Sequence, residues 1–251
     1  MIHFLRKFRF KLLAENKINR VILYATGEII LVVIGILIAL SINNWNTEKM
    51  DRILETDYLK RLTNDLAIDT SNYSWTMRTT QRKQEALGTL LDILNNHQLR
   101  SIDSTALLKE VFLGRMLSFA HPKVTTGTFD ELKNTGSFSK ITSTTLRSEI
   151  SNYYFNRDHQ YQRIEQKRLD PGLGDIIDQF IPGIQRLDND FIYRTDLVSI
   201  SEILDHITTP SFKKAVVGEY NLAVFMHGIQ EHGLEVSTDL LNKIKAELKN
   251  H

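Results

Sequence analysis

The longest uninterrupted run of apolar positions lies near the N-terminus, over residues 21–42, and reads VILYATGEIILVVIGILIALSI. Glu28 is its only charged residue. As a helix, the run spans about 33 Å at ~1.5 Å per residue, which matches a hydrocarbon core of about 30 Å. The pattern therefore predicts one transmembrane helix over residues 21–42. A buried core helix is the alternative, and the length of a run without Lys or Arg argues against it.

Aromatic residues bracket this run. Tyr24 and Trp45 are separated by about 31 Å along a helix that rises ~1.5 Å per residue. Amphipathic aromatic side chains concentrate at the two membrane–water interfaces, and this separation matches the distance between the two belts. We therefore expect both residues to lie at a membrane interface.

The basic residues are concentrated before the run. Residues 1–20 contain six Lys or Arg and one acidic residue, whereas residues 43–57 contain two Lys or Arg. The positive-inside rule then predicts a cytoplasmic arm at residues 1–20 and a main domain on the periplasmic side of the inner membrane, at residues 43–251. An uncleaved signal anchor explains the run better than a cleavable signal peptide, whose apolar core is usually ~7–15 residues long.

The arm itself has an amphipathic pattern in HFLRKFRFKLL. Its apolar residues share one helical face, and this pattern predicts a short interfacial helix on anionic lipid. A basic tail that only sets the topology is the alternative. The rest of the chain is mildly acidic, which argues against a nucleic-acid partner. The basic residues of the arm that we expect at the membrane interface are Arg6, Lys7, Arg9 and Lys11.

Three residues of the predicted membrane helix share one face. Gly35 and Ala39 each lie within about 20° of Glu28 around a helix that turns ~100° per residue. Small residues four positions apart let helix backbones approach closely, and a carboxyl group in the apolar region favours a partner. This stripe predicts association with a second copy of the chain or with another membrane protein. In the alternative interpretation, Glu28 extends to the cytoplasmic headgroups and Gly35 is incidental.

Beyond residue 42, apolar positions recur at intervals of three and four, and no stretch alternates with a period of two. This spacing is typical of amphipathic helices, so we predict an all-α protein whose extracytoplasmic domain is a helical bundle. Residues 69–82 are rich in Ser, Thr and Asn, which are poor helix formers, and their structure stays open. Further helices are expected over residues 104–119, 144–168 and 173–180, from Ser201, and from Ser211 to the end as one or two long helices.

Two local patterns refine this expectation. In TGTFDELKNTG, Thr128 and Glu131 have the spacing of a capping box, and Gly136 suits the left-handed position after a helix. Residues 215–229 are apolar nearly all round the helix, so we expect them at the centre of the bundle.

The candidate chemistry is sparse. The chain has no cysteine, which excludes disulfides, zinc–thiolate sites and thiol catalysis. It has no HExxH motif and no nucleophile elbow, so we predict neither an enzyme nor a cofactor. His227 and Glu231 lie four residues apart and could both reach one metal ion. A third ligand is missing, because His232 points about 100° away from Glu231, and a hydrogen-bonded pair explains the spacing equally well.

Several tyrosines fall at helical spacing. Such aromatic residues usually belong to a core, and the alternative is that they line a ligand cavity. They are Tyr73, Tyr153, Tyr154 and Tyr161.

Two segments resemble a known family. They are the N-terminal block KLLAENKINRVILYATGEIILVVIGILIALSINNWN and the central block TFDELKNTGSFSKITSTTLRSEISNYY. Both are similar to parts of an uncharacterised family of single-span membrane proteins found in Bacteroidetes, the domain of unknown function family 6090. The two blocks cover about a quarter of the chain. The resemblance implies a membrane location and no activity, so no catalytic residue follows from it.

The absence of catalytic motifs, together with long helical faces, favours a non-enzymatic envelope protein that scaffolds or binds another envelope component. The second hypothesis is an extracytoplasmic ligand-binding sensor. An arm of 20 residues is too short for an output domain, so such a sensor would signal through a membrane partner. An enzyme is the third hypothesis.

Overall fold

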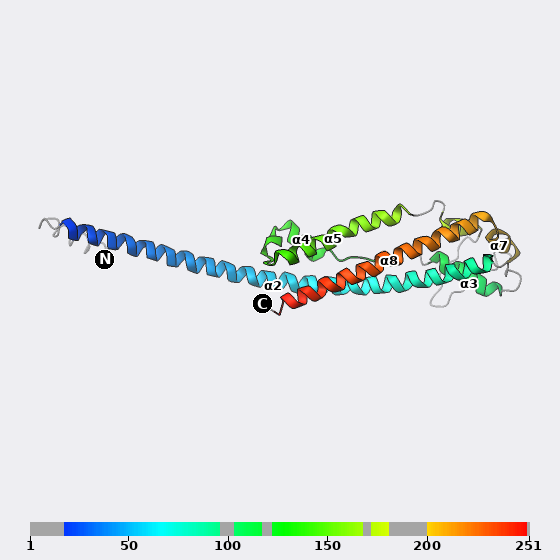
Figure 1. Cartoon of the computed structure of the whole chain (residues 1–251), viewed down its shortest axis with the longest axis horizontal. Coiled ribbons are helices and arrows are strands. Elements are labelled where there is room, and N and C mark those ends of the chain that lie inside the picture. Colours follow the sequence, from blue (N-terminus) through cyan, green and yellow to red (C-terminus); the bar gives the residue numbers. More distant parts are fainter. Residues whose placement is uncertain (1–17, 96–102, 117–121, 168–171, 181–199, 250–251) are drawn as a thin grey trace. The chain divides into compact units, whose positions relative to one another are not determined.

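The computed structural model describes residues 18–95, 103–116, 122–167, 172–180 and 200–249. All regular secondary structure in these ranges is helical, which confirms the predicted all-α class (Figure 1). The chain divides into two units, Met1–Glu55 and Thr56–His251. The elements in chain order are α2 (Ile18–Asn95), α3 (Ser104–Met116), α4 (Gly127–Asn134), η2 (Ser137–Lys140), α5 (Thr144–Glu165), α6 (Leu173–Phe180), α7 (Ile200–Ile207) and α8 (Pro210–Glu247).

The first unit contains the N-terminal part of α2, and no protein covers its apolar side chains. Ile22 is 58% exposed and Ile42 is 61% exposed, and the large apolar residues between them are exposed as well. By length and composition, α2 is the one described helix that is able to cross a membrane. Apolar side chains left bare by the protein are compatible with a lipid environment.

The structure describes some, but not all, of the residues predicted to lie at the membrane. Tyr24 and Trp45 are exposed on α2. Glu28, Gly35 and Ala39 also lie at exposed positions of α2. A side chain at Gly35 would meet no atom of another segment within 4 Å. The basic arm, including Arg6, Lys7, Arg9 and Lys11, lies outside the described residues.

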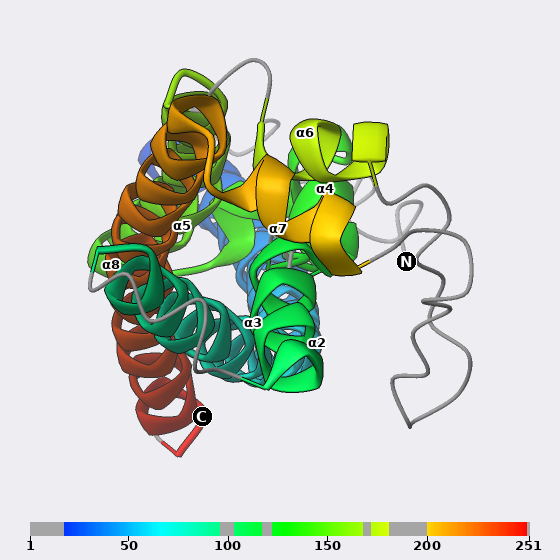
Figure 2. The same cartoon turned by 90° about the vertical axis from the view of Figure 1, so that its right-hand side faces the viewer.

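The second unit is built from three long helical segments, the C-terminal part of α2 with α5 and α8 (Figure 1). Short helices α3, α6 and α7 gather near one end of them (Figure 2). There, one apolar core joins the end of α2 to α3, α6, α7 and the start of α8, with Leu90, Ile177 and Phe212 fully or almost fully buried. A second core joins α2, α4, α5 and the end of α8 around Leu62 and Ile150. Burial of these stripes supplies most of the stability of such helices.

The Ser- and Thr-rich stretch at residues 69–82 belongs to α2. Its hydroxyl groups donate hydrogen bonds back to carbonyl oxygens of the preceding turn, as Thr76 does to Asn72 at 2.9 Å and Thr79 to Trp75 at 3.0 Å. Buried Tyr73 and Thr80 pack the same segment into the unit. Tertiary packing and local hydroxyl bonding together outweigh the weak helix propensity of this stretch.

The predicted helix ends are largely confirmed. Gly136 has φ of 69°, the left-handed conformation that a residue without a Cβ adopts at no steric cost. Helix α6 covers the predicted residues 173–180, and the C-terminal helical region is one helix, α8. The expectation that residues 215–229 lie at the centre of the bundle holds for one face of the segment, because Val217 is 40% exposed and Val224 is 44% exposed. Among the described residues, one face of α8 packs against the other helices.

The predicted capping box is also wrong. Helix α4 begins at Gly127 after Thr126, whose side chain makes no capping hydrogen bond. The backbone N–H of Thr128 donates to Asp65 of α2 at 3.3 Å, and Glu131 contacts Arg61 of α2. Carboxylates from another helix therefore satisfy the start of α4, in place of the local pair.

A buried ion pair joins α2 to α8. Lys83 donates to Glu219, and their side chains are 3% and 10% exposed. A pair this well buried is costly to desolvate and costlier to break, because removal of one partner leaves an uncompensated charge in the interior.

Candidate functional site

Helix α5 separates two concave sites of the second unit. Its residues 149, 152, 153 and 156 recur every three or four positions and face α8. Residues 151, 154 and 155 lie on the side that faces α4 and η2. Neighbouring Tyr153 and Tyr154 therefore belong to different sites, with their ring centroids 5.0 Å apart.

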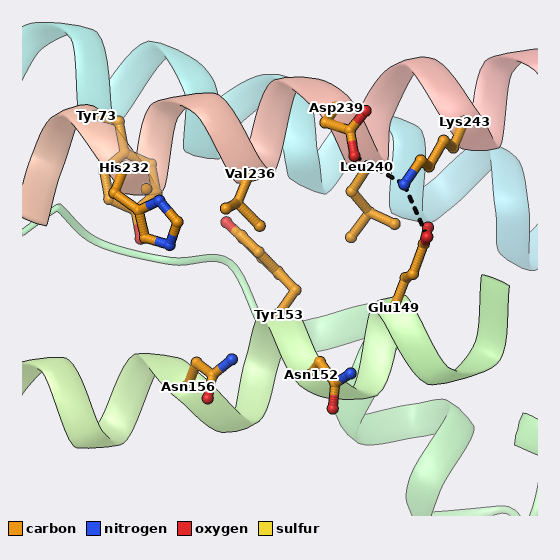
Figure 3. Close-up of a pocket in the computed structure, with 11 residues that line it drawn as sticks. Tyr73, Glu149, Asn152, Tyr153, Asn156, His232, Val236, Asp239, Leu240 and Lys243 are labelled. Atoms are coloured by element: carbon orange, nitrogen blue, oxygen red, sulfur yellow. Dashed lines mark hydrogen bonds and ion pairs between the residues drawn. The ribbon is translucent and has the colours of Figure 1, made fainter. Parts of the chain in front are cut away.

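The first site, here called the inter-helix cavity, lies between α2, α5 and α8 and has a volume of about 190 Å³ (Figure 3). A close approach of two helices closes one side of it. A Cβ on Gly233 of α8 would lie 2.2 Å from Cε1 of Tyr73 of α2, so only glycine allows this contact. The remaining lining residues are Glu149, Asn152, Tyr153 and Asn156 of α5, and His232, Val236, Asp239, Leu240 and Lys243 of α8.

The charged groups of the inter-helix cavity are paired with one another. The Lys243 ammonium lies 2.7 Å from Oε1 of Glu149 and 2.9 Å from Oδ2 of Asp239 (Figure 3). Hydrogen bonds to Asp239 and then to Glu149 raise the pKa of Lys243. The ammonium is therefore held between two carboxylates at the rim.

A buried network ties the cavity wall to α4. The Tyr153 hydroxyl donates to Oδ2 of Asp69 at 2.8 Å, and the backbone N–H of Thr125 donates to Oδ1 at 2.7 Å. Asp69 is fully buried, and desolvation raises its pKa while the bonds from Thr125 and Tyr153 oppose the rise. Burial and the neighbouring Asp69 charge raise the pKa of Tyr153. The phenol is therefore a hydrogen-bond donor rather than a base.

The second site, here called the aromatic groove, lies between α4, η2 and α5 and has a volume of about 440 Å³. Phe129 stacks on Tyr154 with ring centroids 4.3 Å apart, and Phe138 meets Phe129 edge to face at 5.9 Å. Phe155 at the side of the groove is 65% exposed. The other lining residues are Thr126, Asp130, Lys133 and Ser151.

The groove is held rigidly on α2. Arg61 makes two hydrogen bonds to Glu131, which also accepts one from the Tyr58 hydroxyl at 3.3 Å. This contact lowers the pKa of Glu131 and raises that of Arg61. Together with the Asp65 and Asp69 bonds, it ties α4 and the residue Thr125 before it to α2 through a bidentate pair and two backbone N–H groups.

The two sites differ in whether their charged side chains form ion pairs. In the inter-helix cavity, Lys243 already has two carboxylate partners. In the aromatic groove, Asp130 and Lys133 are exposed and form no ion pair with another residue of the described ranges. The groove therefore offers one free charge of each sign beside an exposed aromatic surface.

A comparison with protein families identifies the family of the chain. The family of unknown function DUF6090 matches residues 28–172, more than half of the chain. The chain belongs to this family. No curated protein and no solved structure matches it. The DUF6090 match includes every residue that lines the aromatic groove, whereas it ends before α8, which forms one wall of the inter-helix cavity.

The residues singled out from the sequence have mixed outcomes in this DUF6090 member. His227 is half-buried and Glu231 exposed on α8, and the described residues contain no group of three or more His, Asp or Glu that could hold a metal. Tyr73, Tyr153 and Tyr154 are buried, and they also line the two sites, so core and cavity interpretations both apply to them. The side chain of Tyr161 lies outside the described residues.

Sequence reasoning missed the aromatic groove. Phe129 lies in the block TGTFDELKNTG, which was interpreted only as a helix boundary. Phe138 comes directly after that block, and Phe155 follows the two buried tyrosines. The position of Phe155, one residue after the apolar stripe of its helix, could have indicated an exposed ring. A side chain at that position points away from the buried face of the helix.

Proposed function

We propose that the chain is a non-enzymatic module of the cell envelope, anchored by one membrane helix, which binds a segment of another polypeptide in the aromatic groove. The observation that carries this proposal is the exposed Phe155 beside stacked rings and the unpaired charges of Asp130 and Lys133. Aromatic residues are enriched in the buried centres of protein interfaces, where a few of them supply most of the binding energy.

The anchor of the proposed module is the apolar part of α2 at residues 21–42, with its uncovered side chains. The Lys and Arg residues that precede it support a cytoplasmic N-terminus and a periplasmic main unit in the inner membrane. The stripe of Glu28, Gly35 and Ala39 supports association of the membrane helix with a second copy or another membrane protein.

The topology is tested with reporters fused after His251. A phosphatase that is active only in the periplasm is expected to be active there, and a fluorescent protein that folds only in the cytoplasm is expected to stay dark. The chain should remain in the membrane fraction after alkaline extraction, because a spanning helix is not removed by charge neutralisation. The reverse reporter pattern would contradict the periplasmic placement.

Binding in the groove is tested by site-specific photo-crosslinking in cells. A photoreactive phenylalanine analogue at position 155 is expected to give an adduct with the mass of a second polypeptide. The same group at Gln162, an exposed position of α5 outside the groove, is the matched control.

The contribution of Phe155 to partner binding is measured with Phe155→Glu, and Gln162→Glu is the charge-matched control. Because loss of a central aromatic anchor typically costs ~2 kcal/mol or more, recovery of the cross-linked partner should fall at least about tenfold with Phe155→Glu only. Because Phe155 is 65% exposed, the unfolding temperature should change much less than recovery of the partner. Equal adducts from positions 155 and 162, or none from either, would contradict the groove as the binding site.

The second candidate is an extracytoplasmic ligand-binding sensor that passes its signal to a membrane partner. The inter-helix cavity favours it, because the cavity is concave and lined by both polar and apolar side chains.

A further inference from the structure

The inter-helix cavity shares no lining residue with the aromatic groove. Its volume of about 190 Å³ has room for about six water molecules at ~30 Å³ each. Pockets for drug-sized molecules and cofactors usually begin at about 300 Å³. This volume matches a molecule of monosaccharide size better than a nucleotide or a larger cofactor.

The charges of the cavity select against charged ligands. Glu149 and Asp239 are both compensated by one ammonium, that of Lys243, which leaves a net negative rim. A phosphate or a carboxylate ligand would face this excess of negative charge. A cationic ligand would have to compete with Lys243 for the two carboxylates. A neutral ligand meets neither cost.

The hydrogen-bonding groups favour hydroxyls. Asn152 and Asn156 line the cavity from α5, four residues apart on one helix face (Figure 3). Both side chains are exposed, so their amides are accessible to a ligand. An amide presents both donors and acceptors, and a hydroxyl group can satisfy both at once. Two such amides are suited to a ligand with several hydroxyl groups.

Apolar surface completes the cavity. The rings of Tyr73 and Tyr153 and the side chains of Val236 and Leu240 line its inner part. Tyr73 is held against Gly233, and Tyr153 is held by its bond to Asp69, so both rings have fixed positions. A sugar ring carries C–H groups on its faces that would pack on this surface while its hydroxyls reach the amides.

We propose that the inter-helix cavity is a binding site for a neutral polyhydroxylated molecule of monosaccharide size, which Asn152 and Asn156 hold by hydrogen bonds. This site is independent of the aromatic groove and of a polypeptide partner.

The test uses the full chain in nanodiscs of phosphatidylethanolamine and phosphatidylglycerol, so that no sugar detergent occupies the cavity. The neutral probes are D-glucose, D-galactose, N-acetyl-D-glucosamine and myo-inositol. D-glucuronate and D-glucosamine are charged probes of the same size. Thermal unfolding followed by circular dichroism should show a saturable rise in Tm, on the order of 5 °C at a large excess over Kd, with at least one neutral probe. The charged probes should give a smaller rise.

Variants assign the binding to the cavity. Asn152→Leu and Asn156→Leu are each expected to weaken binding of that probe about tenfold, and the exposed Gln162→Leu on the same helix should leave binding unchanged. Both asparagines are exposed, so the unliganded variants should unfold at the same temperature as the parent. The proposal is overturned if no neutral probe gives a saturable shift, if the charged probes bind equally well, or if both asparagine variants retain full binding.

Discussion

Replacement of Lys83 by methionine is expected to lower the free energy of unfolding by about 3–5 kcal/mol. Lys83 is the partner of Glu219 in the interior between α2 and α8, where the Glu219 side chain is only 10% exposed. Methionine fills a similar volume without the charge, so the variant leaves a carboxylate uncompensated in the interior. Urea unfolding of the full chain in nanodiscs, followed by circular dichroism, measures the loss.

The double variant Lys83→Met/Glu219→Leu separates the ion pair from the packing. An apolar pair of similar volume removes both desolvation costs, so the double variant should recover most of the stability that the single variant loses. A single variant within about 1 kcal/mol of the parent, well below the ~3 kcal/mol minimum for breaking a buried pair, would contradict the buried pair. So would a double variant that is no better than the single one.

Replacement of Asp69 by alanine is the second large effect. Two donors, the Tyr153 hydroxyl and the Thr125 N–H, would lose a fully buried acceptor. At ~1–3 kcal/mol for each of the two unsatisfied donors, the expected loss is about 2–6 kcal/mol in the free energy of unfolding. Tyr153→Phe leaves Oδ2 of the buried Asp69 without its donor but keeps the bond from Thr125, so it should cost about 1–3 kcal/mol, less than Asp69→Ala. Equal losses for Asp69→Ala and Tyr153→Phe in urea unfolding would contradict this assignment.

The pH dependence of the same group has a defined sign. Burial raises the pKa of Asp69 in the folded chain above its ordinary value of 3.8. The folded chain therefore binds this proton more tightly than the unfolded chain, and the contribution of Asp69 to stability increases as the pH falls through the folded pKa. The stability difference between the parent and Asp69→Asn should widen in the parent's favour as the pH is lowered toward 3.8. A difference that narrows over this range would show that the pKa is lowered.

The start of α4 shows where local sequence rules fail. Thr128 and Glu131 have capping-box spacing, yet Glu131 is bound by Arg61, and Asp65 takes the N–H of Thr128. These competing groups lie 70 and 63 residues away in the chain. A charged guanidinium with two hydrogen bonds outcompetes a single bond to a backbone N–H, and no local pattern reveals that it is near.

Both candidate sites have the same origin. The inter-helix cavity takes its lining from α2, α5 and α8, and Tyr73 and Lys243, which are distant in the chain, both line it. The periodic tyrosines could be predicted to be buried, because period alone identifies an inner face. Which of them would border an open volume depended on how the helices pack, and on the close contact that Gly233 permits.

The helical class, the apolar run at residues 21–42, the extent of α6 and the left-handed turn at Gly136 could all be predicted from the sequence. Each of these depends on interactions within a few residues or on the hydrophobicity of one continuous segment. Other features could not be predicted and follow from the packing of the helices: the helical state of residues 69–82, the exposure of Val217 and Val224, the Lys83–Glu219 pair and the positions of the cavity and the groove. These features depend on contacts between helices that are distant in the chain. Hydrophobic periodicity predicts that one face of a helix is buried, but it does not predict which other helix covers that face.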